Sequence, residues 1–389
     1  MNQETGFNNA LIARLRPYLS ENSLLVRSPG RINLIGEHTD YNEGFVLPAA
    51  IDKAVYLALT PRADDLINLH AIDLQADFKT TLGEIRKSDH SWTNYILGVA
   101  AEFIKKGVPL RGFDAGLVSD IPIGSGLSSS AAVECAMALA LNEYLQTAFE
   151  RFTLARMAQT AEHEYAGVQC GIMDQFASMF GKKNRAIRLD CRSLEYEYLP
   201  IELRGIAIVL FDSGIKHELA STEYNTRRLQ CEAGVSFIRE FNPEIKSLRD
   251  ADPEMLDTYV AGRDPVVYRR CRYVLEENKR LSDACKDLQK GDIAAFGREL
   301  FASHTGLSKS YEVSCKELDF LVELVRGNKG VLGARMMGGG FGGCTLNLVR
   351  EESLEKLKEQ VEDAYYTFSG IRLKTYIASI EEGTAIIPR

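Results

Sequence analysis

The strongest constraint on the fold is the stretch PIGSGLSSSAA at residues 122–132, which lies between a predicted strand and a predicted apolar helix. Its glycines allow sharp turns and a close approach of the backbone to another group. Three serines then stand at the expected helix start, where free backbone N–H groups and the positive end of the helix dipole favour a bound phosphate. The stretch therefore predicts a strand, loop and helix with a phosphate site at the loop.

This loop matches neither of two common nucleotide-binding patterns. The Gly-x-x-x-x-Gly-Lys-Ser/Thr pattern of a P-loop is absent, and the third glycine of the dinucleotide fingerprint is missing. Serine hydroxyls can nevertheless hydrogen-bond a phosphate or ligate magnesium. The structural alternative is a serine-capped helix after a tight turn, and the residues alone leave both interpretations open.

The 389-residue chain is long enough for about two or three domains. No Pro/Ser-rich linker or repeat interrupts it, so we expect two closely packed α+β domains with a boundary near residues 185–205. We divide the chain into an N-terminal α/β domain, residues 1–195, and a C-terminal α+β domain, residues 196–389. A ligand site is expected between them.

Hydrophobic periodicity and turn residues predict the order of elements along the chain. In the first half we expect a helix at 7–20, followed by a strand, a Pro-Gly turn and a strand at 24–36. A strand at 45–62, more strands to residue 82 and a helix at 91–107 come next. After the Gly/Ser loop and its helix we expect another helix, a loop at 166–173 and a helix opened by Asp174. In the second half we expect a buried strand at 205–213, mainly long helices at 222–326, two strands around a glycine-rich loop at 333–349, a helix at 354–368 and a last strand at 373–381.

Composition excludes several classes of function. A net charge of −8 and a pI near 5.5 provide no field that would gather nucleic acid or an anionic membrane. The eight cysteines contain no Cys-x-x-Cys pair, which indicates free thiols in a reducing cytoplasm rather than a zinc ribbon or a disulfide framework. The N-terminus lacks the pattern of a signal peptide, and no apolar run approaches the length of a membrane span. We expect a cytoplasmic protein with no obligate protein partner.

The stretch GRINLIGEHTDYNEG at residues 30–44 places charged groups between two strand-like runs, where an Asn-Gly pair would close a hairpin with fewer residues. Glu37, His38 and Asp40 all offer metal ligands, but no other histidine stands at ligand spacing. A second interpretation is a polyol site, in which charged acceptors take hydrogen bonds from sugar hydroxyls. The third is a solvated loop.

Three further features each have a functional and a structural interpretation. The run MMGGGFGG at 336–343 is costly to order unless its backbone must approach another group closely, and is otherwise a flexible loop. Asp174 follows a glycine turn at an expected helix start, as either an N-cap or a general base. Glu162 lies late in an amphipathic helix, and is either solvent-exposed or, together with Ser130, a magnesium ligand.

These motifs, in this order, resemble the galactokinase branch of the superfamily that also includes homoserine kinase, mevalonate kinase and phosphomevalonate kinase. GRINLIGEHTDYN resembles the galactokinase signature, PIGSGLSSSAA the superfamily's phosphate loop, and GARMMGGGFGGC its third motif. The stretches WTNY at 92–95, CGIMDQF at 170–176, LDCRSLE at 189–195 and STEYNTRRLQCE at 221–232 match as well. The resemblance spans nearly the whole chain and implies a two-domain, mixed α/β small-molecule kinase fold with its active site between the domains.

The resemblance also implies roles for individual positions. Asp174 would take the proton from the C1 hydroxyl of the sugar, and Arg31 would keep that carboxylate ionised and offset charge on the transferring phosphoryl group. Trp92 would belong to the adenine pocket, and Ser130 and Glu162 would ligate magnesium. The residues implied to hold galactose are Glu37, His38, Thr39, Asp40, Gly171 and Tyr224, and those implied to bind the ATP phosphates are Gly124, Ser125, Gly126, Leu127, Ser128, Ser129 and Ser130.

The implied reaction is phosphorylation of the C1 hydroxyl of α-D-galactose by ATP and Mg²⁺, giving galactose 1-phosphate and ADP in the Leloir pathway. Two alternatives stay open: a kinase for a related sugar, such as N-acetylgalactosamine or arabinose, and a non-catalytic regulator that binds galactose and ATP. The intact GLSSSAA favours an enzyme, because such regulators are altered there. One departure is Met337, which stands where galactokinases usually have threonine; the lost hydroxyl concerns nucleotide affinity rather than the reaction class.

Overall fold

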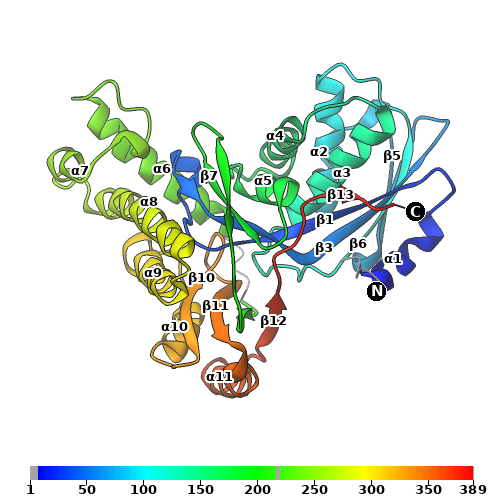
Figure 1. The fold of residues 1–389 in the computed structure, drawn as a ribbon. Helices are drawn as coiled ribbons and strands as arrows, with labels where there is room; N and C mark the ends of the chain where they lie inside the picture. The colour runs from blue at the N-terminus through cyan, green and yellow to red at the C-terminus, as the bar shows by residue number, and fades with distance from the viewer. Residues whose placement is uncertain (1–7, 216–219, 389) are drawn as a thin grey trace.

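The structure, a computed structural model, describes residues 8–215 and 220–388 (Figure 1). Its largest sheet has the strand order β13-β1-β3-β6-β4-β5, and all neighbours are antiparallel except β4 and β6. These strands are β1 (Leu24–Asn33), β3 (Pro48–Pro61), β4 (Leu66–Ala71), β5 (Ala76–Thr81), β6 (Phe113–Ser119) and β13 (Ala385–Ile386). One face is covered by α2 (Ser91–Lys105), α3 (Ser129–Leu145), α4 (Arg151–Ala161) and α5 (Met173–Phe180), and α1 (Asn9–Leu15) packs on the other.

Two further sheets complete the strands. The second sheet has the order β10-β11-β9-β12, with β9 (Ile206–Asp212), β10 (Val331–Met336), β11 (Cys344–Arg350) and β12 (Lys374–Ala378). The helices α10 (Lys316–Val325) and α11 (Leu354–Ser369) pack against it. The third sheet contains β2 (Phe45–Val46), β7 (Arg185–Asp190) and β8 (Tyr196–Pro200).

The remaining helices lie together at the left of Figure 1. They are α6 (Ala220–Arg239), α7 (Pro253–Tyr259), α8 (Pro265–Lys290) and α9 (Ile293–Thr305). Two π-helical turns, Glu162–Ala166 and Gly306–Tyr311, extend α4 and α9. In the part of the chain that the structure describes, no helix has both the length and the apolar character needed to cross a bilayer.

The predicted order of elements is confirmed for the helix at 91–107, the strand, loop and helix at 113–145, the helical region at 222–326 and the strands around the glycine-rich loop. The helix predicted at 7–20 is shorter, because α1 ends at Leu15 and a 3-10 turn with Pro17 follows; residue 7 lies outside the described residues. The short strand β13 is absent from the predicted elements, since two residues show no period.

The Pro-Gly turn predicted within residues 24–36 is wrong, because Pro29 and Gly30 lie inside the single strand β1. The register of β1 against β3 shifts between Pro29 and Arg31, which forms a bulge. A Cβ at Gly30 would meet the carbonyl oxygen of Leu127 at 2.6 Å, and the N–H of Arg31 donates to the same oxygen at 3.1 Å. The bulge therefore joins β1 to the Gly/Ser loop at a distance that a side chain would prevent.

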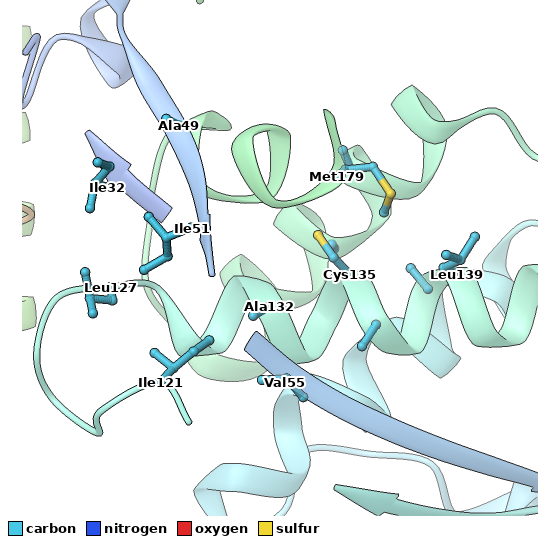
Figure 2. Close-up of a cluster of buried hydrophobic side chains, with 14 of the residues drawn as sticks. Ile32, Ala49, Ile51, Val55, Ile121, Leu127, Ala132, Cys135, Leu139 and Met179 are labelled. Atoms are coloured by element: carbon cyan, nitrogen blue, oxygen red, sulfur yellow. The ribbon is translucent and has the colours of Figure 1, made fainter. Parts of the chain in front are cut away.

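Helix α3 lies in the centre of the largest core and determines where the Gly/Ser loop ends. Figure 2 shows Ala132, Cys135 and Leu139 of α3 in the same cluster of buried side chains as Ile51 and Val55 of β3. Alanines at positions 131, 132, 136, 138 and 140 are buried and let the helix lie close to β1 and β3. The N-terminus of α3 is thereby held in a fixed place relative to the bulge in β1.

The domain boundary near residue 195 stays a prediction. Strand β8 ends at Pro200 and the second sheet begins with β9 at Ile206. After β12 the chain returns to the first sheet, where Ile386 of β13 pairs with Val26 of β1 (Figure 1). The last residues therefore pack with the N-terminal half although they follow the C-terminal half in sequence.

Candidate active site

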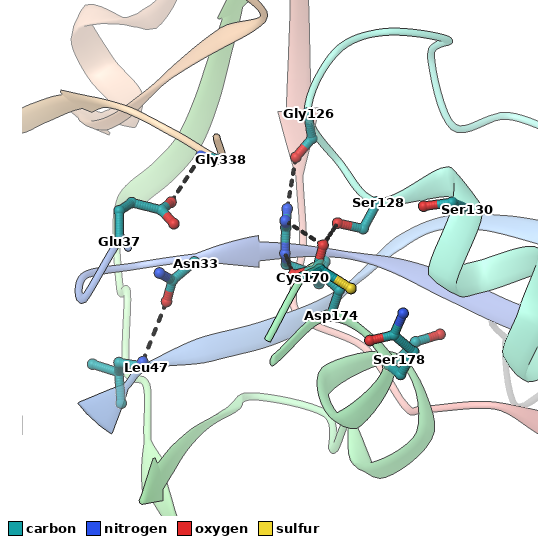
Figure 3. Close-up of polar contacts among 12 residues, drawn as sticks. Asn33, Glu37, Leu47, Gly126, Ser128, Ser130, Cys170, Asp174, Ser178 and Gly338 are labelled. Carbon is teal, nitrogen blue, oxygen red and sulfur yellow. Dashed lines mark hydrogen bonds and ion pairs between the residues drawn. The ribbon is translucent and has the colours of Figure 1, made fainter. Parts of the chain in front are cut away.

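The Gly/Ser loop reaches α3 through left-handed backbone conformations. Gly124 and Gly126 have φ near +79° and +77°, and Ser128 has φ near +59°. Ser128 occupies the N-cap position of α3, but its hydroxyl does not cap the helix. It donates instead to Oδ2 of Asp174 at 2.5 Å (Figure 3). The serine-cap interpretation is therefore wrong for Ser128.

Asp174 is held by the loop and by β1 together. Nε and Nη2 of Arg31 donate to its two carboxylate oxygens, each at 2.8 Å, and Nη1 of Arg31 donates to the carbonyl of Gly126 at 2.6 Å. Burial disfavours the charge on Arg31, yet Asp174 and Glu37 raise its pKa above the ordinary value. The N-cap interpretation of Asp174 is wrong, because Ile172 takes the N-cap position of α5. The pair leaves a fixed carboxylate next to the loop.

The side chains of Ser125 and Leu127 point away from the site, whereas Ser129 and Ser130 begin α3. The hydroxyl of Ser125 donates to the carbonyl of Pro122 at 2.7 Å, and the side chain of Leu127 belongs to the core, so both offer the site only backbone groups. Ser129 and Ser130 begin α3 and are half-buried. Ser130 donates to Oε1 of Glu162 at 3.0 Å.

Glu162 is buried, so its interpretation as a solvent-exposed helix residue is wrong. Its second oxygen, Oε2, accepts a hydrogen bond from Nε2 of Gln175 at 2.6 Å. Burial and the nearby carboxylate of Asp174 raise the pKa of Glu162. A hydroxyl and a carboxylate beside further buried acids form a hard-oxygen donor set, which fits a divalent cation such as Mg²⁺.

The polar stretch at 30–44 is buried against α8 from Gly36 onward, so the solvated-loop interpretation is wrong. Oε1 of Glu277 accepts from the N–H of Gly36 at 3.1 Å, and the hydroxyl of Tyr273 donates to the carbonyl of Glu37 at 3.1 Å. The Glu37 carboxylate forms an ion pair with Arg335 and accepts from the N–H of Gly338 at 2.7 Å (Figure 3). Among the described residues, no group of three His, Cys, Asp or Glu side chains could hold a metal ion, and the charged partner of Glu37 is an arginine.

His38 lies next to Gly339 of the glycine-rich loop, and Asp40 lies next to Gly171. His38 has φ near +62°, and its Nε2 lies 3.2 Å from the carbonyl oxygen of Gly339. Asp40 lies so close to Gly171 that a Cβ at that position would be 2.0 Å from Oδ2. Burial and the charge of Asp174 raise the pKa of Asp40 to about 7. Gly171 is therefore required for Asp40 to occupy its place.

One cavity joins both predicted catalytic residues and five of the six residues implied to hold galactose. Thr39 is not among its lining residues: its hydroxyl donates to the carbonyl oxygens of Gly36 and Phe45, at 2.9 and 2.5 Å, and holds the turn closed. Tyr224 of α6 lines the cavity, with its ring 5.2 Å from that of His38. The lining residues are Arg31, Glu37, His38, Asp40, Glu162, Val168, Cys170, Gly171, Met173, Asp174, Tyr224, Gly338 and Gly339.

A second, mainly apolar pocket includes the start of α3. Trp92 and Tyr95 of α2 line it together with Ile123, Ser129 and Ser130. A flat aromatic ring next to a polar helix start suits a ligand with one planar apolar part and one anionic part. Trp92 thus lies beside the start of α3, and its role in an adenine pocket stays a prediction.

Family models match three parts of this chain. The model described as GHMP kinases N terminal domain matches residues 94–182, and the one described as GHMP kinases C terminal matches residues 284–367. The galactokinase galactose-binding signature matches residues 17–61, which include the polar stretch. The galactokinase of Thermotoga petrophila is 42% identical over 358 residues, which cover 92% of this chain and 98% of the relative. The chain belongs to the galactokinase family.

Other members of the galactokinase family agree with this assignment. The galactokinase of a Roseiflexus strain is 40% identical and covers 92% of each chain. The crystal structure of Lactococcus lactis galactokinase complexed with galactose superposes with a TM-score of 0.92 at 34% identity, over 97% of this chain and 99% of that one. A mevalonate kinase structure shares the fold, with a TM-score of 0.65 at 19% identity. The expected two-lobed, mixed α/β kinase fold is confirmed. The chain is an enzyme of the sugar kinase class, and ATP use comes with the galactokinase family.

Sequence reasoning missed several residues of this galactokinase-family site. Arg335, which is fully buried, stands in the quoted GARMMGGGFGGC, but a single arginine carried no signal about its partner Glu37. Gln175 follows Asp174 directly, and nothing in its local sequence indicates its partner, Glu162. Met337, at the usual threonine position, is buried in the core, and its carbonyl would lie 3.5 Å from a Cβ at Gly126. Its backbone therefore supports the Gly/Ser loop, while its side chain faces apolar neighbours.

Proposed function

We propose that this chain transfers the γ-phosphoryl group of ATP to the C1 hydroxyl of α-D-galactose, giving galactose 1-phosphate and ADP in the Leloir pathway. The observation that carries the proposal is the position of Asp174. Its carboxylate lines the cavity beside Glu37, His38 and Asp40, and it also accepts a hydrogen bond from Ser128 of the Gly/Ser loop. A base at the junction of a polyol cavity and a phosphate loop is what phosphoryl transfer to a sugar hydroxyl needs.

The sugar would be held by the buried polar groups of the cavity. Glu37 and Asp40 offer acceptors to sugar hydroxyls, and His38 offers a ring nitrogen. Tyr224 would cover one face of the sugar, and Gly171 would let its backbone approach closely. Thr39 would act through the turn that its hydroxyl closes, a supporting role in galactose binding.

The chemical step would use the Arg31–Asp174 pair. Asp174 would accept the proton of the C1 hydroxyl as that oxygen forms a bond to the γ-phosphorus, while the bond between that phosphorus and the bridging oxygen of ADP breaks. Arg31, which binds both oxygens of Asp174, would offset the negative charge of the transferring group. Arg31 also donates to the carbonyl of Gly126, and Asp174 accepts from Ser128. Both side chains are therefore positioned before the substrates bind.

The nucleotide would lie across the start of α3. Backbone groups from Gly124 to Ser129 would bind the phosphates, and the pocket with Trp92 would take the adenine. Ser130 and Glu162 would hold Mg²⁺, which would neutralise negative charge on the ATP phosphates. The 3.0 Å contact between these two side chains supports this assignment.

Two narrower proposals follow from composition. The eight cysteines are free thiols in the structure, which supports a reducing, cytoplasmic location. Galactose and ATP would be the partners, without nucleic acid, membrane or an obligate protein partner, in agreement with the net charge of −8. The related-sugar kinase and the non-catalytic regulator are not favoured over galactose phosphorylation.

The test is an assay that couples ADP release to a chromogenic reaction, with galactose and Mg²⁺, for the wild-type protein and two matched variants. Asp174→Asn removes the base but keeps the shape, and we expect kcat to fall by about 10²- to 10⁴-fold. Asp114→Asn is the control: that carboxylate lies on β6, away from the cavity, and binds Arg62 and Asn68, so kcat should stay unchanged. A wild-type protein that releases no ADP with galactose would refute the function, and an active Asp174→Asn would refute the base.

A further inference from the structure

A row of hydrogen-bonded side chains leads from His38 away from the cavity into the helices of the C-terminal half. Nδ1 of His38 lies 2.7 Å from the hydroxyl of Tyr41, and that hydroxyl lies 2.8 Å from the hydroxyl of Tyr311. The hydroxyl of Tyr311 lies 3.3 Å from Sγ of Cys231 on α6. His38, Tyr311 and Cys231 are each at most 3% exposed, and Tyr41, which joins His38 to Tyr311, is half-buried.

The direction of every proton in this row follows from one carbonyl group. The oxygen of Gly339 can only accept, so Nε2 of His38 must carry the hydrogen in their 3.2 Å contact. If the ring is neutral, Nδ1 is an acceptor and the hydroxyl of Tyr41 donates to it. The oxygen of Tyr41 then accepts from Tyr311, and the oxygen of Tyr311 accepts from the thiol of Cys231.

The ring of His38 is held neutral by its surroundings. Burial lowers its pKa to about 3, with a further contribution from the charges of Arg227 and Arg335, while the bond to Gly339 acts in the opposite direction. The rings of Tyr224 and Tyr311 lie 5.2 and 5.0 Å from the imidazole and fix its plane. Geometry and burial therefore agree on a neutral imidazole with its hydrogen on Nε2.

We propose that Tyr41 and Tyr311 are positioning residues, which hold His38 as its Nε2–H tautomer so that it presents a hydrogen-bond donor, and no acceptor, to one hydroxyl of the sugar. This inference deepens the proposed function, since it rests on His38 as a galactose-binding residue. The sugar hydroxyl would accept the hydrogen that Gly339 now accepts. Neither tyrosine lines the cavity, so both act through the histidine.

The first test needs no substrate. Nitrogen-15 NMR of the imidazole, assigned by its loss in His38→Gln, should report hydrogen on Nε2 in the wild-type protein. In Tyr41→Phe the donor to Nδ1 is lost and only the carbonyl of Gly339 still favours this tautomer, so we expect a mixture of tautomers. Tyr56→Phe is the matched control, because it removes another buried hydroxyl, which accepts from the N–H of Asn8 at 2.8 Å outside the cavity. An Nδ1–H tautomer in the wild-type protein, or an unchanged tautomer in Tyr41→Phe, would overturn the proposal.

The second test separates binding from chemistry. In Tyr41→Phe we expect KM for galactose to rise about tenfold with kcat within about twofold, and in Tyr311→Phe a smaller rise in the same direction. KM for ATP should not change in either variant, and Tyr56→Phe should change neither constant. A fall in kcat with unchanged KM for galactose would contradict a role in holding the sugar.

A series of monodeoxy galactose analogues then identifies the contact. The penalty of Tyr41→Phe should vanish for the one analogue that lacks the hydroxyl bound by His38, because effects on interacting groups are not additive. An equal penalty for every analogue would show a general loss of structure and would overturn the proposal. If the wild-type protein phosphorylates no sugar, the proposed function fails, while the NMR measurement still decides the tautomer.

Discussion

Replacing Arg335 with methionine should destabilise the protein far more than the loss of a surface charge would. Arg335 is 0% exposed and Glu37 is 2% exposed. Methionine fills much of the same volume but leaves the carboxylate of Glu37 buried, with the N–H of Gly338 as its hydrogen-bond donor on the glycine-rich loop. Removing one partner of a buried ion pair typically costs about 3 to 5 kcal/mol, because the remaining charge is desolvated without compensation.

Urea unfolding followed by circular dichroism would measure this loss. Arg335→Lys should retain part of the stability, because a single nitrogen, Nη2, makes the contacts to both Glu37 and the carbonyl of Asn33 in the structure. The double variant Glu37→Gln/Arg335→Met should be more stable than Arg335→Met alone, since it removes the unpaired charge. Arg62→Met, which breaks partly exposed pairs with Asp64 and Asp114, should have a much smaller effect.

The same variants also test how the site is built. Because Glu37 touches Gly338 as well as the cavity, its displacement in Arg335→Met should raise KM for galactose in the folded fraction. A variant Arg335→Met with wild-type stability would refute the reasoning that this pair holds the polar stretch against the glycine loop. So would a double variant that is less stable than Arg335→Met.

Three further outcomes can be measured. Asp40 has its pKa raised from 3.8 to about 7, so the folded state binds this proton more tightly than the unfolded state, and the free energy of unfolding should fall by roughly 3 kcal/mol as pH rises from 4 to 7; Asp40→Asn should remove that part of the pH dependence, and an unchanged profile would argue against it. Gly171→Ala places a Cβ at 2.0 Å from Oδ2 of Asp40 and should raise KM for galactose at least about tenfold, whereas Gly83→Ala, with nothing within 4 Å, should not. Trp92 is the sole tryptophan of the chain, so ATP should change the intrinsic fluorescence and galactose should not; a response to galactose alone would contradict the adenine assignment.

Local patterns predicted most of the elements, because each depends on neighbours in the chain. The 3.6-residue period identified α2 and the helices of 222–326, and the Gly/Ser run placed the start of α3. The errors arose where distant segments meet. Pro29-Gly30 has the composition of a turn, but it forms a bulge since the loop carbonyl of Leu127 packs on it. The two residues of β13 carry no period, and they form a strand only because β1 offers an edge.

In the candidate site too, local motifs indicated the residues themselves but not their distant partners. Asp174, Arg31, Glu37, His38, Asp40 and Gly171 were selected from motifs, and the structure brings them to one cavity. Their partners lie elsewhere in the chain: Arg335 is 298 residues from Glu37, and Tyr311 is 270 residues from Tyr41. No pattern within a short window could indicate such pairs, and the residues concerned look like ordinary members of a strand or helix.

The sequence alone indicated the chemistry that this chain carries, because its motifs, taken in order, resemble those of the galactokinase branch. The tertiary structure decided which of these groups are buried, which are neutral and which meet. Burial sets the charge of Asp40 and His38, and burial is a property of packing between segments far apart in the chain. The polar stretch at 30–44 became a site because α8, the glycine loop and the Gly/Ser loop close around it.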